Sequence, residues 1–192
     1  MDNKKNKRQF IIESAMKIFC RDGFHKAKVS EIALRAGVGK GTIYEYFDSK
    51  KHLFAEMMKY YADIYYENLI KTIEDEANII DKFRKYIYLE AQVITNNGEL
   101  AHIFMHEAHN VGIEIHKLLE TRHRKKIDFI ANLIQTGINL GTFREVHPYT
   151  AALSFMGSIH HILVSKLFFK DNLSEEIHIE NLHELFLNGI KK

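Results

Sequence analysis

The chain has 192 residues, of which 46% are hydrophobic, so it can bury a core and is not globally disordered. Its net charge of +2 is unevenly spread: residues 1–50 carry 11 Lys and Arg against 6 Asp and Glu, whereas residues 51–192 carry 16 against 19. This polarity favours a polyanion as partner of the basic first quarter, although a solvated basic tail would give the same counts.

Cysteine use and hydropathy exclude several classes of protein. The single cysteine, Cys20, excludes an internal disulfide and a thiolate-rich metal site within one chain, and it suits the reducing cytoplasm, where we expect the protein. The basic N-terminus is not followed by the apolar run of a signal peptide. The apolar stretch over 151–169 contains His160, His161 and Lys166, so we expect no membrane span.

Hydrophobic residues repeat with helical spacing almost throughout, which predicts an all-α fold of about nine helices. A first helix ends at Gly23, and two short helices follow over about 29–36 and 40–47. Asp48 or Ser49 caps a long fourth helix. Later helices are predicted over 78–96, 99–109, 112–139, from Pro148 to about 169, and after a cap at Ser174, with breaks at 97–98 and Gly141.

Residues 37–47, GVGKGTIYEYF, place three glycines in five positions. One explanation is a nucleotide-binding P-loop, but that motif needs Ser or Thr after its lysine and a buried strand before it. Here Gly41 follows Lys40, and the preceding residues have helical spacing. The stretch is therefore not expected to bind a nucleotide.

The same stretch meets the demands of a helix-turn-helix. Ala33 is the small residue needed where two helices press together, and Gly37, four residues later, suits a turn with positive φ. The apolar anchors around the turn are Ile32, Val38, Ile43 and Phe47. The second helix starts with Gly39, Lys40, Gly41 and Thr42, whose backbone N–H groups can come close to phosphate.

An ordinary helical hairpin is the alternative, with Tyr44 and Tyr46 as packing residues. These tyrosines alternate with the anchors Ile43 and Phe47, so their rings are expected to lie off the core face. Helices this short are also marginal alone and suit a packed three-helix DNA reader. The motif and the basic charge together predict DNA binding.

The stretch FHKAKVSEIALRAGVGKGTIYEYFDSKKHLF closely resembles the DNA-binding domain of TetR-family transcriptional regulators. The resemblance is strong over about residues 8–54, and beyond them it concerns length, helix number and a final helix pair. It implies a DNA-binding domain over 1–48, a connecting fourth helix from about 49, and an effector-binding and dimerisation domain over 49–192. It further implies a repressor that a small effector releases from operator DNA.

The resemblance also assigns DNA contacts to particular residues. Base-edge contacts are expected from Lys40 and Thr42 beside Gly41, and backbone contacts from Tyr44, Tyr46 and Lys50. Two positions depart from the family pattern. Ala27 and Lys28 replace a hydroxyl pair before the second helix, so Lys28 is expected to reach phosphate. Gly39 replaces a serine, which weakens the cap of the recognition helix.

For the larger domain the resemblance implies a pocket between helices, although aromatic residues at helical spacing more commonly form a core. We expect an apolar, elongated effector in a pocket lined by Phe83, Ile87, Ala91, Ile94, Phe104, Ile127, Ile130 and Phe155. The last two helices carry apolar stripes broad enough to bury a second face on another copy. A homodimer is therefore expected, with an interface formed by Ala152, Met156, Ile159, Leu163, Leu182, Leu185 and Phe186.

Five of the 12 histidines fall within residues 102–123. His102, His106 and His109 could share a helix face, with a further ligand from His160 or His161, so a metal- or haem-responsive regulator is the alternative function. A polar face in a His-rich chain is the simpler explanation, and we expect no bound metal or cofactor. No nucleophile, base and acid stand out together, so we expect no enzyme. The sequence identifies neither the effector nor the operator.

Overall fold

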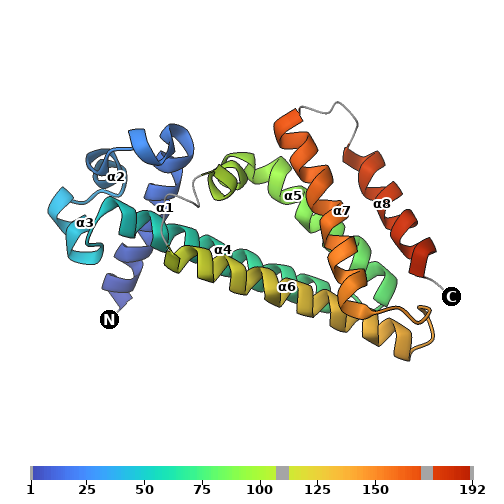
Figure 1. The fold of residues 1–192 in the computed structure, drawn as a ribbon. Helices are drawn as coiled ribbons and strands as arrows, with labels where there is room; N and C mark the ends of the chain where they lie inside the picture. The colour runs from blue at the N-terminus through green and yellow to red at the C-terminus, as the bar shows by residue number, and fades with distance from the viewer. Residues whose placement is uncertain (1, 107–112, 170–174, 191–192) are drawn as a thin grey trace. The chain divides into compact units, whose positions relative to one another are not determined.

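The computed structural model describes residues 2–106, 113–169 and 175–190, and these form eight helices without a strand (Figure 1). The predicted all-α fold is thereby confirmed. The helices are α1 (Asp2–Lys26), α2 (Val29–Arg35), α3 (Lys40–Tyr46), α4 (Lys50–Glu74), α5 (Ile79–His106), α6 (Ile113–Asn139), α7 (Pro148–Phe169) and α8 (Glu175–Ile190). Among the described helices, none is both long enough and apolar enough to traverse a lipid bilayer.

Most predicted helix boundaries that fall on described residues lie within a few residues of the observed ones, and the largest difference is at residues 97–98. The break expected at residues 97–98 is wrong, because α5 continues through it, and the described ranges therefore contain one helix fewer than expected. A glycine inside a helix costs only about 1 kcal/mol relative to alanine, which the remaining turns of α5 can offset. Ser174, the expected cap of the last helix, lies outside the described residues.

Contacts divide the chain into two compact units, with the division inside α4 between Tyr65 and Tyr66. Unit 1 comprises residues 1–65 and 99–119, and unit 2 comprises residues 66–98 and 120–192. Unit 1 therefore contains α1 and the two short helices α2 and α3 of the predicted helix-turn-helix region. Unit 2 contains α7, α8 and most of α6.

Unit 1 is built on one apolar core shared by α1 to α4. Ile11 and Phe19 from α1 are fully buried, as are Leu53 and Phe54 from α4. The rings of Phe19 and Phe54 meet edge to face with centroids 4.8 Å apart. At Gly23, φ is 72°, so α1 bends there before a last turn ends at Lys26. The predicted end of the first regular helix is therefore this bend.

A left-handed glycine joins α2 to α3. Gly37 has φ of 66°, as the sequence predicted. The N–H of Val38 donates to the carbonyl of Ala33 at 3.0 Å, and the N–H of Gly37 donates to the carbonyl of Leu34 at 3.2 Å. This pair of bonds is a Schellman motif, which satisfies the last carbonyls of α2 and sets the direction in which α3 leaves.

Ser49, and not Asp48, caps α4. The Ser49 hydroxyl oxygen accepts a hydrogen bond from the backbone N–H of His52 at 3.0 Å. Asp48 instead lies 3.2 Å from the Nδ1 of His52. The cap begins the helix directly after the recognition segment, so α3 and α4 are separated by only a few residues.

Unit 2 has an aromatic core. The ring of Phe83 lies 5.7 Å from Phe143, 5.2 Å from Phe155 and 5.6 Å from Phe186, measured between centroids. Phe143 packs directly on Gly137, where an added Cβ would lie 2.1 Å from the ring. Gly141, with φ of 72°, ends α6 and lets the chain return Phe143 to this core.

His183 of α8 is a buried polar group beside this core. Its side chain is 4% exposed, and its Nε2 has no hydrogen-bond partner among the described residues. Burial lowers the pKa of His183, and the charge of Arg84 lowers it further. A hydrogen bond with the backbone of Ile80 and the charges of Glu184 and Asp81 act in the opposite direction.

We expect the folded state to lose stability as the pH falls below about 6.5, the ordinary histidine value. The unfolded chain binds the His183 proton more readily than the folded chain, so protonation favours unfolding in this window. The variant His183→Gln should show a smaller loss between about pH 8 and pH 5 in urea unfolding. His161→Gln, at an exposed position, should keep the wild-type pH dependence. Identical profiles for His183→Gln and the wild type would contradict this role.

Candidate nucleic-acid interface and ligand cavity

The exposed side of α3 is defined by the residues that anchor its other side. Ile43 is 1% exposed and Phe47, directly after the helix, is fully buried. Helical geometry then turns Lys40, Gly41 and Tyr44 outward, and all three are exposed. These three predicted contact residues therefore lie on the exposed side of α3.

Two of the other predicted contact residues lie nearer the core. Thr42 is half-buried at the flank of the exposed side. Tyr46 is half-buried too, and it packs against the core of unit 1 with its ring 6.4 Å from that of Phe47, so the expectation that its ring lies off the core face is wrong. Glu45, which the sequence analysis did not select, is exposed beside Tyr44. The sequence could have indicated this exposure, because Glu45 is adjacent to the predicted contact residue Tyr44 on a helix of only two turns.

Gly39 and Gly41 differ from Gly37 in that the fold itself does not require glycine there. Gly39 has φ of −70°, which any residue adopts. An added Cβ at Gly41 would meet no atom within 4 Å, and at Gly39 it would meet only the Thr42 hydroxyl, at 4.0 Å. Because Gly39 and Gly41 have no side chains, the backbone at the start of α3 is accessible to close contact from another molecule.

The two helices also lack side-chain caps, as the sequence predicted. Lys28 occupies the N-cap position of α2 and Gly39 that of α3, and neither makes a side-chain capping hydrogen bond. The Lys28 side chain is exposed. Its ammonium group is therefore placed at the surface beside the start of α2.

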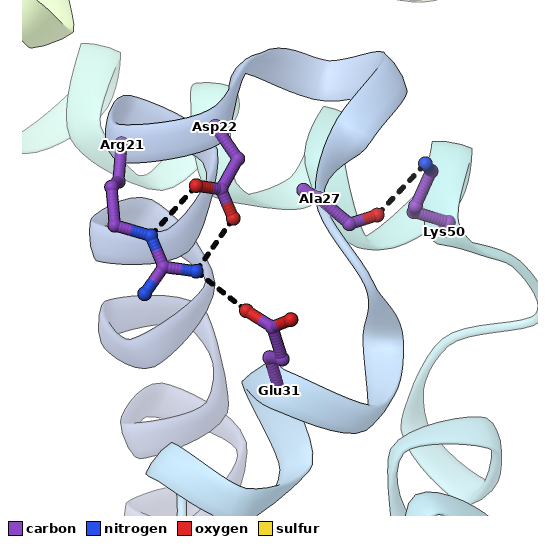
Figure 2. Close-up of polar contacts among 5 residues, drawn as sticks. All are labelled: Arg21, Asp22, Ala27, Glu31 and Lys50. Atoms are coloured by element: carbon purple, nitrogen blue, oxygen red, sulfur yellow. Dashed lines mark hydrogen bonds and ion pairs between the residues drawn. The ribbon is translucent and has the colours of Figure 1, made fainter.

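Lys50, expected to bind phosphate, is engaged with the protein. Its ammonium donates hydrogen bonds to the carbonyl of Ala27 at 3.0 Å and of His25 at 3.1 Å, and Figure 2 shows the first of these. The same nitrogen lies 4.8 Å from the centroid of the Phe24 ring. Lys50 thus links the start of α4 to the end of α1.

An ion cluster joins α1 to α2 nearby. The Arg21 guanidinium binds both carboxylate oxygens of Asp22, at 2.7 and 2.6 Å, and also binds Glu31 of α2 (Figure 2). These hydrogen bonds lower the pKa of Asp22. The cluster is largely exposed, so its contribution to stability is small.

Unit 2 contains a cavity of about 230 Å³ between α5, α6 and α7. Its walls are mostly apolar, with one ion pair and two histidines. The lining residues are Tyr86, Glu90, His123, Lys126, Leu153, Met156, Gly157, Ile159, His160 and Leu163. A mainly apolar cavity with a few polar groups is the usual form of a small-molecule site.

The polar groups of this cavity come from three helices, with Glu90 in α5, His123 and Lys126 in α6, and His160 in α7. Lys126 of α6 and Glu90 of α5 form an ion pair at 2.8 Å, with side chains only 20% and 13% exposed. Burial lowers the pKa of His123, as do the charges of Lys126 and His160, whereas Glu90 opposes them. Helical spacing cannot pair charges on two different helices, so sequence reasoning missed this feature.

Six of the eight residues predicted to line a pocket are buried in the core of unit 2. Those whose side chains are described are less than 5% exposed and none lines the cavity: Phe83, Ile87, Ala91, Ile127, Ile130 and Phe155. The side chains of Ile94 and Phe104 lie outside the described part of the chain. The cavity is instead lined by sequence neighbours of the predicted residues, such as Tyr86 and Lys126.

The residues predicted to form a dimer interface differ widely in exposure. Ala152, Met156 and Ile159 are buried within the single chain, and Phe186 lies in the aromatic core, 4.5 Å from Phe155. Leu185, by contrast, is 74% exposed. Leu163 and Leu182 are half-buried. Leu153 of α7, which the prediction did not include, is 45% exposed and also lines the cavity.

The histidine-based alternative gains no support from the described side chains. His123 and His160 both line the cavity, but the described residues contain no group of three or more His, Cys, Asp or Glu that could hold a metal ion. The side chains of His102, His106 and His109 lie outside the described part.

Two family models match this chain. The model described as bacterial regulatory proteins, tetR family, matches residues 11–57, which include the whole helix-turn-helix. The model of a tetracyclin repressor-like C-terminal domain matches residues 76–163. The two matches follow the order expected from the sequence.

Individual proteins agree with these models. The fatty acid metabolism regulator protein of Bacillus subtilis is 25% identical over 76% of this chain and 75% of its own. A FadR regulator from Bacillus subtilis in complex with stearoyl-CoA superposes with a TM-score of 0.78 at 22% identity, covering 95% and 98% of the two chains. A chain from Saccharomonospora viridis, described as a transcriptional regulator and bound to choline, gives 0.85 at 19% identity, covering 98% and 99%. The chain belongs to the TetR family of bacterial transcriptional regulators and is not an enzyme.

Proposed function

We propose that this protein is a repressor that binds operator DNA through α3 and is released by a small molecule bound in unit 2. The exposed side of α3 carries the proposal. Lys40 and Tyr44 are exposed there. Gly41 leaves the backbone uncovered, although the structure has room for a larger residue at this position. Lys40 and Thr42 are assigned to base edges, and Lys28 and Tyr44 to the DNA backbone.

The repressor acts as a homodimer, which presents two copies of α3 to one duplex. Two-fold symmetry then requires half-sites about 34–36 Å apart or a multiple of this spacing. An effector that prefers a different separation of the two α3 helices lowers DNA affinity by the ratio of its affinities for the two states.

The proposed effector is an acyl compound with an apolar chain and a polar end. The cavity offers Met156, Ile159 and Leu163 to the chain and the Lys126–Glu90 pair to the polar end. The stearoyl-CoA of the Bacillus subtilis FadR complex is a compound of this chemistry. At about 230 Å³ the cavity is smaller than a typical drug-sized pocket, so it accommodates part of such a molecule.

Duplexes selected from a random pool should bind with an affinity that falls steeply with salt, because Lys side chains displace counterions from phosphate. On a selected duplex, Gly41→Ala should bind at least about tenfold more weakly, since its methyl group occupies the approach to the DNA. Its melting temperature should be unchanged or higher, because alanine is the better helix residue.

Gly189→Ala is the matched control. Gly189 also lies in a helix with free space around it, so this variant should keep both stability and DNA affinity. Failure to select any sequence, or normal binding by Gly41→Ala, would contradict the proposed interface.

The effector site can be tested by neutralising its ion pair at nearly constant volume. In the double variant Lys126→Met, Glu90→Gln, binding to DNA should be retained, while the acyl-CoA concentration that releases half of the DNA should rise at least about tenfold. Lys125→Met, at the exposed neighbouring position, should respond like the wild type. Release by choline and not by acyl-CoA thioesters of any chain length would contradict an acyl effector.

The exposed side of α8 is proposed to form the centre of the dimer interface, at Leu185, with α7 beside it. Leu185→Glu should shift the protein towards monomer in sedimentation and weaken operator binding, because the charge would be buried at the interface. Leu140→Glu replaces a leucine of similar exposure, 68%, in the turn after α6 and should remain dimeric. A dimeric Leu185→Glu would place the interface elsewhere.

A further inference from the structure

We propose that Lys50 is a positioning residue of the DNA-binding unit and not a phosphate contact. It fastens the first residue of α4 to the segment that connects α1 with α2, and so holds the helix-turn-helix in the arrangement that binds DNA. This role differs from the phosphate contact that the family resemblance implied.

Lys50 already has partners within the protein. A lysine ammonium has three N–H donors, and two of them are used on the carbonyls of His25 and Ala27. The ammonium also lies over the Phe24 ring, at 4.8 Å from its centroid. Only the third N–H could reach a phosphate without the loss of these bonds, and a contact made in place of them would leave the two carbonyls without their cation.

The two carbonyls that Lys50 binds lie where α1 ends. Gly23 bends α1, and the last turn after the bend ends at Lys26, so the His25 and Ala27 carbonyls lie at a helix C-terminus. Carbonyls there lack intrahelical donors and carry the negative end of the helix dipole. A cation that binds both is therefore a C-terminal cap, supplied from another helix.

The segment that Lys50 binds lies directly before α2. Ala27 is buried, and it is followed at once by Lys28, the N-cap residue of α2. Since α2 carries no side-chain cap, its start is held by its neighbours, and Lys50 binds the residue just before it. Displacing Ala27 would therefore displace the start of α2 and, through the Gly37 turn, α3.

The test compares salt dependence with affinity in Lys50→Met, Lys50→Arg and Lys51→Met. In Lys50→Met, operator affinity should fall about tenfold at every salt concentration, the loss expected for hydrogen bonds to a charged group. The slope of log affinity against log salt should stay as in the wild type, because no phosphate contact is lost. Lys50→Arg should restore most of the affinity, since a guanidinium can donate to two carbonyls.

Lys51→Met is the matched control, because Lys51 is the adjacent exposed lysine and its loss changes the net charge equally. Any effect of net charge alone will appear in both methionine variants. A slope that falls by about 0.9 in Lys50→Met and not in Lys51→Met would identify a phosphate contact and overturn the proposal.

A second measurement needs no variant. The backbone carbonyl ¹³C resonances of His25 and Ala27, followed by NMR in the wild-type protein, should keep their positions when operator DNA is added. Their movement to the positions seen in free Lys50→Met would show that DNA takes the ammonium away from these carbonyls, and this result too would overturn the proposal.

Discussion

The orientation of α3 depends on one backbone conformation, the left-handed turn at Gly37. Because this turn is closed by the bonds from Val38 to Ala33 and from Gly37 to Leu34, α3 leaves α2 in a fixed direction. Ile43 and Phe47 then fix its rotation by entering the core of unit 1. Lys40, Gly41 and Tyr44 face outward as a consequence, without needing any contact of their own.

Lysine ammonium groups hold both ends of α4 in the same chemical way. At its start, Lys50 binds the carbonyls that end α1. At its end, the ammonium of Lys82 binds the carbonyls of Ile73 and Glu74, both at 2.9 Å. Charge-assisted bonds to helix C-termini are stronger than neutral ones, so α4 is constrained at the two places where the chain turns into and out of it.

The sequence predicted the positions of the helices better than it predicted which face of each helix is buried. Gly23, Gly37 and Gly141 bend or end helices through positive φ, and Pro148 begins α7, because these residues act locally. The helix break predicted at residues 97–98 is wrong because a lone glycine is only a weak helix breaker. Phe186 shows the limit for faces: its apolar stripe predicted a dimer contact, but only tertiary packing decides that its ring joins Phe83 and Phe155.

Among the site residues, too, local features could be predicted from the sequence and tertiary contacts could not. Lys40, Gly41 and Tyr44 could be placed from sequence because a two-turn helix with known anchors has only one free side. The role of Lys50 could not, since its partners lie 23 and 25 residues away in the chain. The cavity was missed for a related reason, because its polar groups pair across helices.

The Lys126–Glu90 pair has a consequence for which ligands the cavity can accept. An ion pair in a mainly apolar site is a poor source of stability compared with apolar residues of the same volume, so its value lies in discrimination. A wholly apolar ligand would bury both charges further and gain nothing from them. In the proposed effector site, a ligand with a polar end would bond to Lys126 or Glu90 while its chain covered Met156 and Leu163, and this difference would favour amphipathic molecules over simple hydrocarbons.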